Sequence, residues 1–399
     1  MVQAVKFDKN QLFRWVSAIV ADEYARQHKR PVPAKALLSW SNETLITEDG
    51  IGFDSLARLD LASRLNRLFH MHEVGIEDYL LLEETLGGWV DIVATSVDLK
   101  LERLSFETSG STGVPKLCEH LFDELDREAR EWSGLFEDRE RIITLVPPHH
   151  IFGFLFTVRL PQLLQCELVD AKHMSPSSVA RAATSTSLIV ATPHQWSAMD
   201  RAGVTFTNGS KGVSSTAPLS NQTWLSLADR GLSLIEVFGS SETAGIGHRS
   251  AHNAPFQLRS IWQRDPDADD ILIRDDGQHF QLQDRLNFVD DTFFYPGGRR
   301  DHAVQVGGVN VFPSRVADCL LELDSVAQCA VRSIALESDA SRIRLSAYIV
   351  PKSNQIDESK LLNQLKSHAQ SSLRVAEQPI EYKFGPIIPR NEIGKPTAW

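Results

Sequence analysis

The middle of the chain alternates short β-rich runs with helical stretches, and this alternation restricts the fold more than any other feature. The runs RIITLVP (141–147), SLIVATP (187–193) and LSLIEVFG (232–239) are rich in branched apolar residues. Runs of this kind are typical of largely buried strands, and the helical stretches between them indicate α/β layering. A hairpin that turns at Asp276 and Gly277 is expected in ILIRDDGQHFQL (271–282).

The stretch TSGSTGVPK (108–116) follows the apolar, β-prone run 99–106 and has the composition of an anion-binding loop. Its glycines allow positive φ angles and a close approach of the backbone to a ligand, and successive N–H groups in such a turn can surround an anion. The glycines are Gly110 and Gly113. Hydroxyl groups and a cation complete the set of candidate ligand contacts: Thr108, Ser109, Ser111, Thr112 and Lys116. The spacing differs from the Walker pattern. A flexible surface loop rich in Ser and Gly is the alternative.

The order of residues in this loop resembles the phosphate loop of the adenylate-forming superfamily, which includes acyl-CoA synthetases, luciferases and peptide-synthetase adenylation domains. The resemblance implies ATP and Mg²⁺ as cofactors and a small carboxylic acid as substrate. It also implies further motifs in a fixed order, and these are found between the loop and the end of the chain.

The stretch VFGSSETAG (237–245) resembles the superfamily's aromatic-Gly-x-Thr-Glu motif. The resemblance implies that Phe238 stacks on the purine, and that Glu242 ligates Mg²⁺, a hard cation that prefers oxygen. The nucleotide contacts implied by this motif are Phe238, Gly239, Ser240 and Ser241. The alternative is a strand followed by a helix, with Glu242 in the first helical turn. Upstream, SSTAPLS (214–220) resembles a segment that flanks the adenine, with Ser and Thr in place of two glycines.

The stretch PPHHIFGF (147–154) resembles the Pro-x-x-His-x-x-Gly segment at the acyl pocket. By this resemblance His150 lies near the carboxylate of the substrate and is a catalytic residue together with Lys116, Glu242 and Lys395. The alternative is that both histidines are turn residues with satisfied hydrogen bonds, and this is the favoured interpretation for His149.

Motifs near the C-terminal end supply the remaining implied contacts. Asp284 is the retained member of the superfamily's Thr-Gly-Asp triplet, which binds the ribose hydroxyls, and GRRD (298–301) matches Gly-Arg-x-Asp. By resemblance Arg299 contacts the nucleotide and Asp301 is a hinge before a mobile C-terminal domain. The glycines of VGGVNVFP (306–313), Gly307 and Gly308, match the loop that faces the thiol. An exposed arginine turn is the alternative for 298–301.

Lys395 in PRNEIGKPTAW matches the adenylation lysine, although a lysine so close to a C-terminus is ordinarily a solvated residue. A carboxylate that attacks the α-phosphorus of ATP approaches a polyanion. Lys116, Lys395 and Mg²⁺ on Glu242 would neutralise that charge in the transition state. A thiol would then displace AMP and form a thioester.

Residues 1–97 are expected to be helical, because apolar residues recur at helical spacing in 12–20 and 56–69. GFDSLARLDLASRLNRLF (52–69) resembles an acyl or peptidyl carrier protein, which makes Ser55 a candidate for phosphopantetheine attachment. A helix N-cap at Asp54 or Ser55 is the alternative. We favour a carrier-like relic that serves as packing, in place of a longer subdomain that family members usually have before the phosphate loop.

The predicted fold is therefore α/β: a truncated adenylate-forming core over 98–300, a mobile α+β C-terminal domain over 301–399, and a helical, carrier-protein-like region over 1–97. The 399 residues suffice for these parts, and a net charge of −11 gives nucleic-acid binding little support. Cys118, Cys166, Cys319 and Cys329 form no C-x-x-C pair, which fits a reducing compartment. The sequence shows no apolar signal core and no run long enough for a membrane span, so a cytoplasmic protein is expected.

The predicted function is an ATP-dependent ligase that activates an aromatic acid, such as a hydroxybenzoate, and transfers it to CoA or an acyl carrier protein. The short form resembles aryl acid–acyl carrier protein ligases of aryl-polyene and xanthomonadin-type pathways. Two alternatives stay open. One is an acyl-AMP ligase with another acceptor, and the other is a degenerate nucleotide-binding scaffold that recruits carrier proteins.

Overall fold

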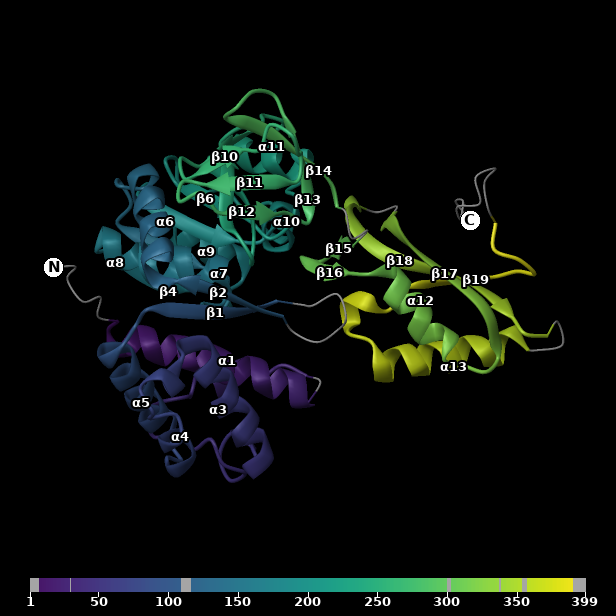
Figure 1. The fold of residues 1–399 in the computed structure, drawn as a ribbon, viewed down its shortest axis with the longest axis horizontal. Coiled ribbons are helices and arrows are strands. Elements are labelled where there is room, and N and C mark those ends of the chain that lie inside the picture. The colour runs from purple at the N-terminus through teal and green to yellow at the C-terminus, as the bar shows by residue number, and fades with distance from the viewer. Residues whose placement is uncertain are drawn as a thin grey trace. The chain divides into compact units, whose positions relative to one another are not determined.

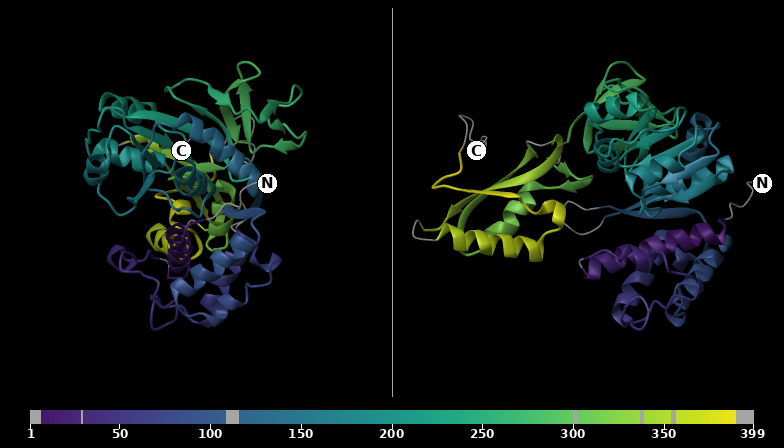
Figure 2. Two further views of the ribbon diagram at one scale, coloured as in Figure 1. Left: turned by 90° about the vertical axis from the view of Figure 1, so that its left-hand side faces the viewer. Right: turned by 180° about the vertical axis from the view of Figure 1, so that it is seen from behind.

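The computed structural model describes residues 7–28, 30–108, 116–299, 303–336, 339–353 and 357–389 (Figures 1 and 2). The described residues divide into two compact units, one that runs to Ala254 and one that begins at Pro255. The predicted divisions at 97/98 and 300/301 remain predictions. In the described part of the chain, no helix combines the length and apolarity that crossing a membrane would need.

The N-terminal part of the first unit is helical, as its apolar periodicity predicted. Asp54 caps the longest of its inner helices, because its carboxylate accepts a hydrogen bond from the backbone N–H of Ala57 at 2.8 Å. His70 ends the same helix in the left-handed conformation, with φ of 51°. The elements are α1 (Lys9–His28), α2 (Ala34–Leu37), α3 (Ser55–Phe69), η1 (Met71–Glu73), α4 (Tyr79–Leu82) and α5 (Leu86–Leu99).

An antiparallel hairpin follows these helices and lies beside them in both figures. It consists of β1 (Arg103–Thr108) and β2 (Lys116–Leu121), and its register pairs Thr108 with Lys116 at the end where the predicted phosphate loop connects the strands. Leu104 and Phe106 are fully buried on one face of β1. The hairpin therefore places Lys116 at a defined backbone position. Helix α6 (Phe122–Leu135) follows directly.

The rest of the first unit confirms the predicted α/β alternation. Its strands lie in the order β4, β3, β5, β6, β7 and β8, and all neighbours are parallel except β7 and β8. Every residue of β5 is buried. The strands are β3 (Arg141–Thr144), β4 (Glu167–Asp170), β5 (Ser187–Ala191), β6 (Lys211–Ser214), β7 (Ser233–Ser240) and β8 (Ala244–Arg249). The helical elements are α7 (Ile151–Phe154), η2 (Leu155–Arg159), α8 (Leu160–Leu164), α9 (Pro176–Ala182), α10 (Pro193–Arg201) and α11 (Asn221–Asp229).

Alternate strand residues belong to two different hydrophobic cores. Leu188 and Val190 of β5 belong to the core that contains the N-terminal helices, α6 and α7, whereas Ile189 belongs to the core that contains residues of α9, α10 and α11. The ring of Trp15 in α1 lies 5.2 Å from that of Phe154 in α7. The N-terminal helices thus share a core with the α/β region, as expected for a segment that serves as packing.

The second unit contains two further sets of strands and a small α+β region. The predicted hairpin joins β11 to β12, and Gly277 takes a φ of 83° in its turn. The strands before residue 300 are β9 (Phe256–Leu258), β10 (Trp262–Arg264), β11 (Ile271–Arg274), β12 (His279–Gln281), β13 (Asp284–Phe288) and β14 (Phe293–Arg299).

The α+β region confirms the expectation of helices and strands after residue 302. Strands β17, β18 and β19 form one sheet in that order, with β18 and β19 parallel. A short hairpin precedes it. The elements are β15 (Val304–Val306), β16 (Val309–Val311), α12 (Pro313–Leu321), β17 (Val326–Leu336), β18 (Asp339–Pro351), α13 (Glu358–Ser372), η3 (Val375–Glu377) and β19 (Glu381–Phe384).

Candidate active site

The fold brings together two residues that the sequence motifs singled out far apart in the chain. Lys116 begins β2, and Glu242 lies in the turn between β7 and β8. The ammonium Nζ of Lys116 is 3.6 Å from Oε1 of Glu242, with 61% and 35% of the two side chains exposed. An ion pair this exposed contributes little to stability. Its accessibility leaves both groups able to meet an incoming ligand.

The backbone around Glu242 forms a tight turn that leads into a strand. The hydroxyl of Ser240 accepts hydrogen bonds from the N–H groups of Glu242 and Thr243, each at 3.2 Å. A Cβ at Gly239 would lie 2.2 Å from the carbonyl oxygen of Ala244, so only glycine fits there. The chain then continues as β8. The alternative in which Glu242 begins a helix is therefore wrong, because the antiparallel pairing of β7 with β8 takes up this backbone.

Two buried side chains from other elements hold this turn and the start of β8, and sequence reasoning missed both. Nε2 of His120 in β2 lies 2.7 Å from the carbonyl oxygen of Ser241, and the carboxylate of Glu128 in α6 accepts a hydrogen bond from the N–H of Gly245 at 3.0 Å. The signal available for His120 was a polar residue four positions after Lys116, at an inward-facing position of the strand. No pattern of spacing pointed to Glu128.

Cys118 lies between Lys116 and His120 on β2, but it is not poised as a nucleophile. Burial raises the pKa of its thiol to about 11, and the nearby carboxylate of Glu242 adds to the shift. The thiol is therefore protonated near neutral pH. This agrees with a reaction that needs no nucleophilic side chain from the protein.

His150 and His149 precede α7 and are both neutral near pH 7. Burial lowers the pKa of His149 well below its ordinary value. The ring of His150 keeps exposed surface, yet desolvation by the surrounding protein lowers its pKa, while Asp22 opposes the shift. A Cβ at Gly153 would lie 1.8 Å from the carbonyl oxygen of Pro147. That close approach explains why the Pro-x-x-His-x-x-Gly spacing requires its glycine.

The segment over 214–220 is held against β7, the strand that carries Phe238. Ser215 donates a hydrogen bond from its hydroxyl to the carbonyl oxygen of Val237 at 2.9 Å, and the N–H of Leu219 donates to buried Glu236 at 2.8 Å. Thr216, which replaces a family glycine, has a φ of 81°. A branched residue rarely adopts this conformation. Phe238 lies on β7 and is partly exposed.

The second unit carries the predicted ribose and thiol-facing residues on two hairpins. Asp284 begins β13 and Arg299 ends β14, and the register places their backbones opposite each other. This pairing accounts for their spacing in the sequence. Gly307 and Gly308 connect β15 to β16 with φ angles of 60° and 84°.

Several predicted residues lie outside the described part of the chain. They are the loop residues Ser109, Gly110, Ser111, Thr112 and Gly113, the hinge Asp301 and the adenylation lysine Lys395. The side chains of Thr108 and Arg299 also lie outside the description. Ser55 is exposed at the first position of α3, directly after the capping residue Asp54, and its modification remains a prediction.

The residues present at the turn fit Mg²⁺. Glu242 offers a partly exposed carboxylate, and hydroxyl oxygens of Ser240 and Thr243 lie in the same turn. Oxygen atoms are the ligands that this ion prefers, and it ordinarily completes its coordination with water and substrate phosphates.

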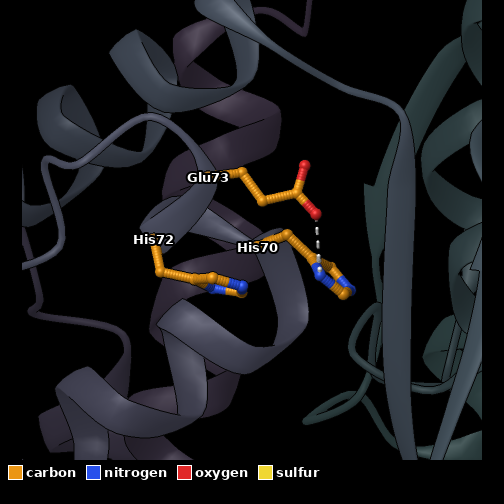
Figure 3. Close-up of side chains that lie close together, drawn as sticks. All are labelled: His70, His72 and Glu73. Carbon is orange, nitrogen blue, oxygen red and sulfur yellow. Dashed lines mark ion pairs between the residues drawn. The ribbon is translucent and has the colours of Figure 1, made fainter.

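A second cluster, His70, His72 and Glu73, has side-chain ligand atoms within 4.8 Å of one another (Figure 3). The carboxylate of Glu73 contacts the ammonium of Lys100 at 2.9 Å and Nε of Arg103 at 3.5 Å, so its charge is already compensated. These two cations would repel a metal ion. We therefore assign this cluster to packing of α3 and η1 against the hairpin.

Comparisons with known proteins identify the family of the chain. Residues 107–272 match the AMP-binding enzyme family. Three proteins named 4-coumarate–CoA ligase match nearly the whole chain. Those of Rhodobacter capsulatus and Halorhodospira halophila are 38% and 34% identical, over 97% of this chain and 99% and 98% of theirs. That of Cereibacter sphaeroides is 32% identical, over 90% of this chain and 86% of its own.

Among solved structures, an o-succinylbenzoate CoA synthetase from Bacillus subtilis has a TM-score of 0.63 at 15% identity, over 97% of this chain and 91% of its own. The chain belongs to the adenylate-forming, AMP-binding enzymes. Within that class it is an AMP-forming acid–CoA ligase.

These matches correct one expectation and leave two others without support. The chain covers 99% of the R. capsulatus ligase and 91% of the B. subtilis synthetase, so the expected truncation is not found. None of them supports a carrier-like fold for the N-terminal helices. A 3,4-dihydroxybenzoate–[aryl-carrier protein] ligase from Bacillus anthracis is only 22% identical, over 56% of this chain, so the aryl-polyene assignment lacks support. A 3-hydroxybenzoate–CoA ligase from Aromatoleum is 28% identical over 36% of this chain.

Proposed function

We propose that this protein converts 4-coumarate, ATP and CoA into 4-coumaroyl-CoA, AMP and pyrophosphate. The observation that carries the proposal is the agreement of three 4-coumarate–CoA ligases with this chain along nearly its whole length. The hydroxybenzoate–CoA ligase matches only about a third of the chain. A hydroxybenzoate substrate is therefore the second candidate, and it would be activated by the same chemistry.

In the first step a carboxylate oxygen of the acid attacks the α-phosphorus of ATP, and pyrophosphate leaves. The barrier is electrostatic, because an anion approaches a polyanion. Lys116 supplies a positive charge. The β1–β2 register sets the position of its backbone, and its contact with Glu242 puts the charge beside the predicted metal ligand. Mg²⁺ at Glu242 would offset phosphate charge. By resemblance, Lys395 adds a further cation in this step.

The acid would enter beside His150. The imidazole of His150 is neutral near pH 7, because desolvation lowers its pKa. A neutral ring can donate one hydrogen bond to the carboxylate without forming an ion pair that holds the nucleophile in its ground state. Because the carboxylate attacks ATP without losing a proton, His150 would act by orienting the acid.

In the second step the thiol of CoA attacks the carbonyl carbon of the acyl-AMP, and AMP leaves with the former carboxylate oxygen. The resemblance assigns this step to the turn at Gly307 and Gly308, after a rotation about Asp301. Asp284 and Arg299 would hold the ribose and phosphate of the nucleotide. Each of these roles is part of the proposal.

The proposal is tested by measuring pyrophosphate release with 4-coumarate, 3-hydroxybenzoate and 4-hydroxybenzoate as parallel substrates. We expect the highest kcat/KM with 4-coumarate, and formation of one thioester per AMP when CoA is added. A higher kcat/KM with a hydroxybenzoate would overturn the choice of acid. Thioester formation on a phosphopantetheinylated carrier protein, with none on CoA, would contradict the choice of acceptor.

A further inference from the structure

A row of polar contacts joins the N-terminal helices to the strand that leads to Lys116. Alternate residues of β1 point toward α3 and η1. Nε of Arg103 lies 3.5 Å from Glu73, and the hydroxyl of Ser105 lies 2.9 Å from Nε2 of His70. These residues share one face of the strand, because successive side chains of a strand alternate. The next residue on this face is Glu107.

Glu107 is the carboxylate of this row that pairs with several guanidinium groups. Three guanidinium groups from two helices lie on it: Nη1 of Arg26 at 3.3 Å, Nη2 of Arg64 at 3.2 Å and Nη2 of Arg67 at 3.2 Å. Arg64 is buried, and it also pairs with Asp22 at 2.7 Å and Glu23 at 2.8 Å. Three carboxylates thus balance three cations. Partly buried pairs that share partners are coupled more strongly than isolated surface pairs.

The place of Glu107 in the chain gives this network a consequence for the site. Its neighbour Thr108 pairs with Lys116 across the hairpin, and Lys116 reaches Glu242 at 3.6 Å. From the other end of β2, His120 holds the turn that carries Glu242. The position of Lys116 therefore depends on β1, and ion pairs attach the end of β1 to α1 and α3.

We infer that Glu107 is a positioning residue for Lys116, and that the helices α1 and α3 serve the active site by holding the end of β1. The inference rests on the proposed function in one respect, which is that Lys116 binds the phosphates of ATP. If Glu107 had only a structural role, its substitution would lower the stability of the protein, and the effect on ATP binding would not depend on Lys116.

A double-mutant cycle separates the two roles, with the ATP dissociation constant measured by calorimetry on the full chain. We expect Glu107→Gln to weaken ATP binding about 10-fold in the wild-type background, and by less than about twofold in a Lys116→Ala background. Equal effects in both backgrounds would overturn the inference, as would unchanged binding by Glu107→Gln. If Glu107→Gln does not fold, Arg67→Gln and Glu107→Asp take its place in the same cycle.

Glu119→Gln is the matched control. Glu119 lies on the same hairpin and pairs with Arg103 at 2.9 Å, but it does not contact the arginines on Glu107. It should leave the ATP dissociation constant unchanged, and a loss equal to that of Glu107→Gln would contradict the inference. If Lys116→Ala itself leaves ATP binding intact, both the proposed role of Lys116 and this inference fail. If Lys116→Ala weakens ATP binding but its effect and that of Glu107→Gln are additive, only the inference about Glu107 is contradicted.

Discussion

The turn over 239–243 and the turn between β15 and β16 are both predicted to face reacting groups, yet they are built by different means. Side chains hold the first turn: the hydroxyl of Ser240 from within, and His120 from β2. Backbone conformation shapes the second, because Gly307 and Gly308 take φ angles of 60° and 84° between two short strands. The turn over 239–243 should therefore be disturbed by loss of the side chains that contact it. The β15–β16 turn should be disturbed by any residue that disfavours a positive φ.

The largest effect is expected for Lys395→Ala, which removes a cation that resemblance assigns to the first step only. Acyl-AMP formation should fall about 10²-fold or more, as for the loss of one preorganised transition-state donor. Thioester formation from supplied acyl-AMP should change little. Rapid-quench assays measure the rates of the two half-reactions. Equal slowing of both would contradict the assignment of Lys395 to the first step alone.

His120→Ala tests the turn that side chains hold. Without the hydrogen bond at 2.7 Å to the carbonyl oxygen of Ser241, the turn loses its buried contact with β2 and keeps the exposed ion pair of Glu242 with Lys116. We expect acyl-AMP formation to fall about 10-fold, by analogy with a misplaced catalytic group, while the thioester step from supplied acyl-AMP is retained. The control is His72→Ala in η1, whose ring contacts Asn66 and His70 rather than this turn, and it should leave the rate unchanged. An unchanged rate of acyl-AMP formation in His120→Ala would show that the turn stands without its tertiary partner.

Gly307→Val tests the turn that the backbone shapes. A Cβ at Gly307 meets no atom within 4 Å, so the cost is the conformational strain of about 1–2 kcal/mol that a side chain adds at positive φ. The thioester step should slow several-fold, and acyl-AMP formation should not. Gly307→Asn is the control, since asparagine tolerates this conformation. If both variants lose the same activity, strain is not the cause.

These two turns also show what the sequence could reveal. Motif order brought Lys116 and Glu242 into one predicted site, and apolar periodicity predicted α1 and α3, because both signals are local or carried by fixed residue types. The contact of His120 with Ser241 and the three arginines on Glu107 were not predicted. They depend on the docking of separate elements, and no local pattern records that docking. The N-cap at Asp54 was foreseen as an alternative to a modified Ser55, since a cap is a local feature.

Thr216→Gly has the smallest expected effect. It tests how much strain the first unit tolerates when a residue other than glycine takes a positive φ. Contacts of Ser215 and Leu219 hold this segment while Thr216 takes a φ of 81°. Glycine would relieve strain of about 1–2 kcal/mol, partly offset by its greater freedom in the unfolded chain. We expect a net gain of roughly 0.5 kcal/mol in the free energy of unfolding, measured with denaturant. A loss of stability would show that the threonine side chain contributes to the native state.

The central claim is that a carboxylate oxygen of 4-coumarate attacks the α-phosphorus of ATP before the thiol of CoA reacts. The direct measurement uses 4-coumarate labelled with a heavy oxygen isotope in its carboxylate, and it reads the label in AMP by mass spectrometry after one round of reaction. The account predicts AMP that carries a single heavy oxygen, with equal amounts of 4-coumaroyl-CoA. Unlabelled AMP, or ADP in its place, would contradict it.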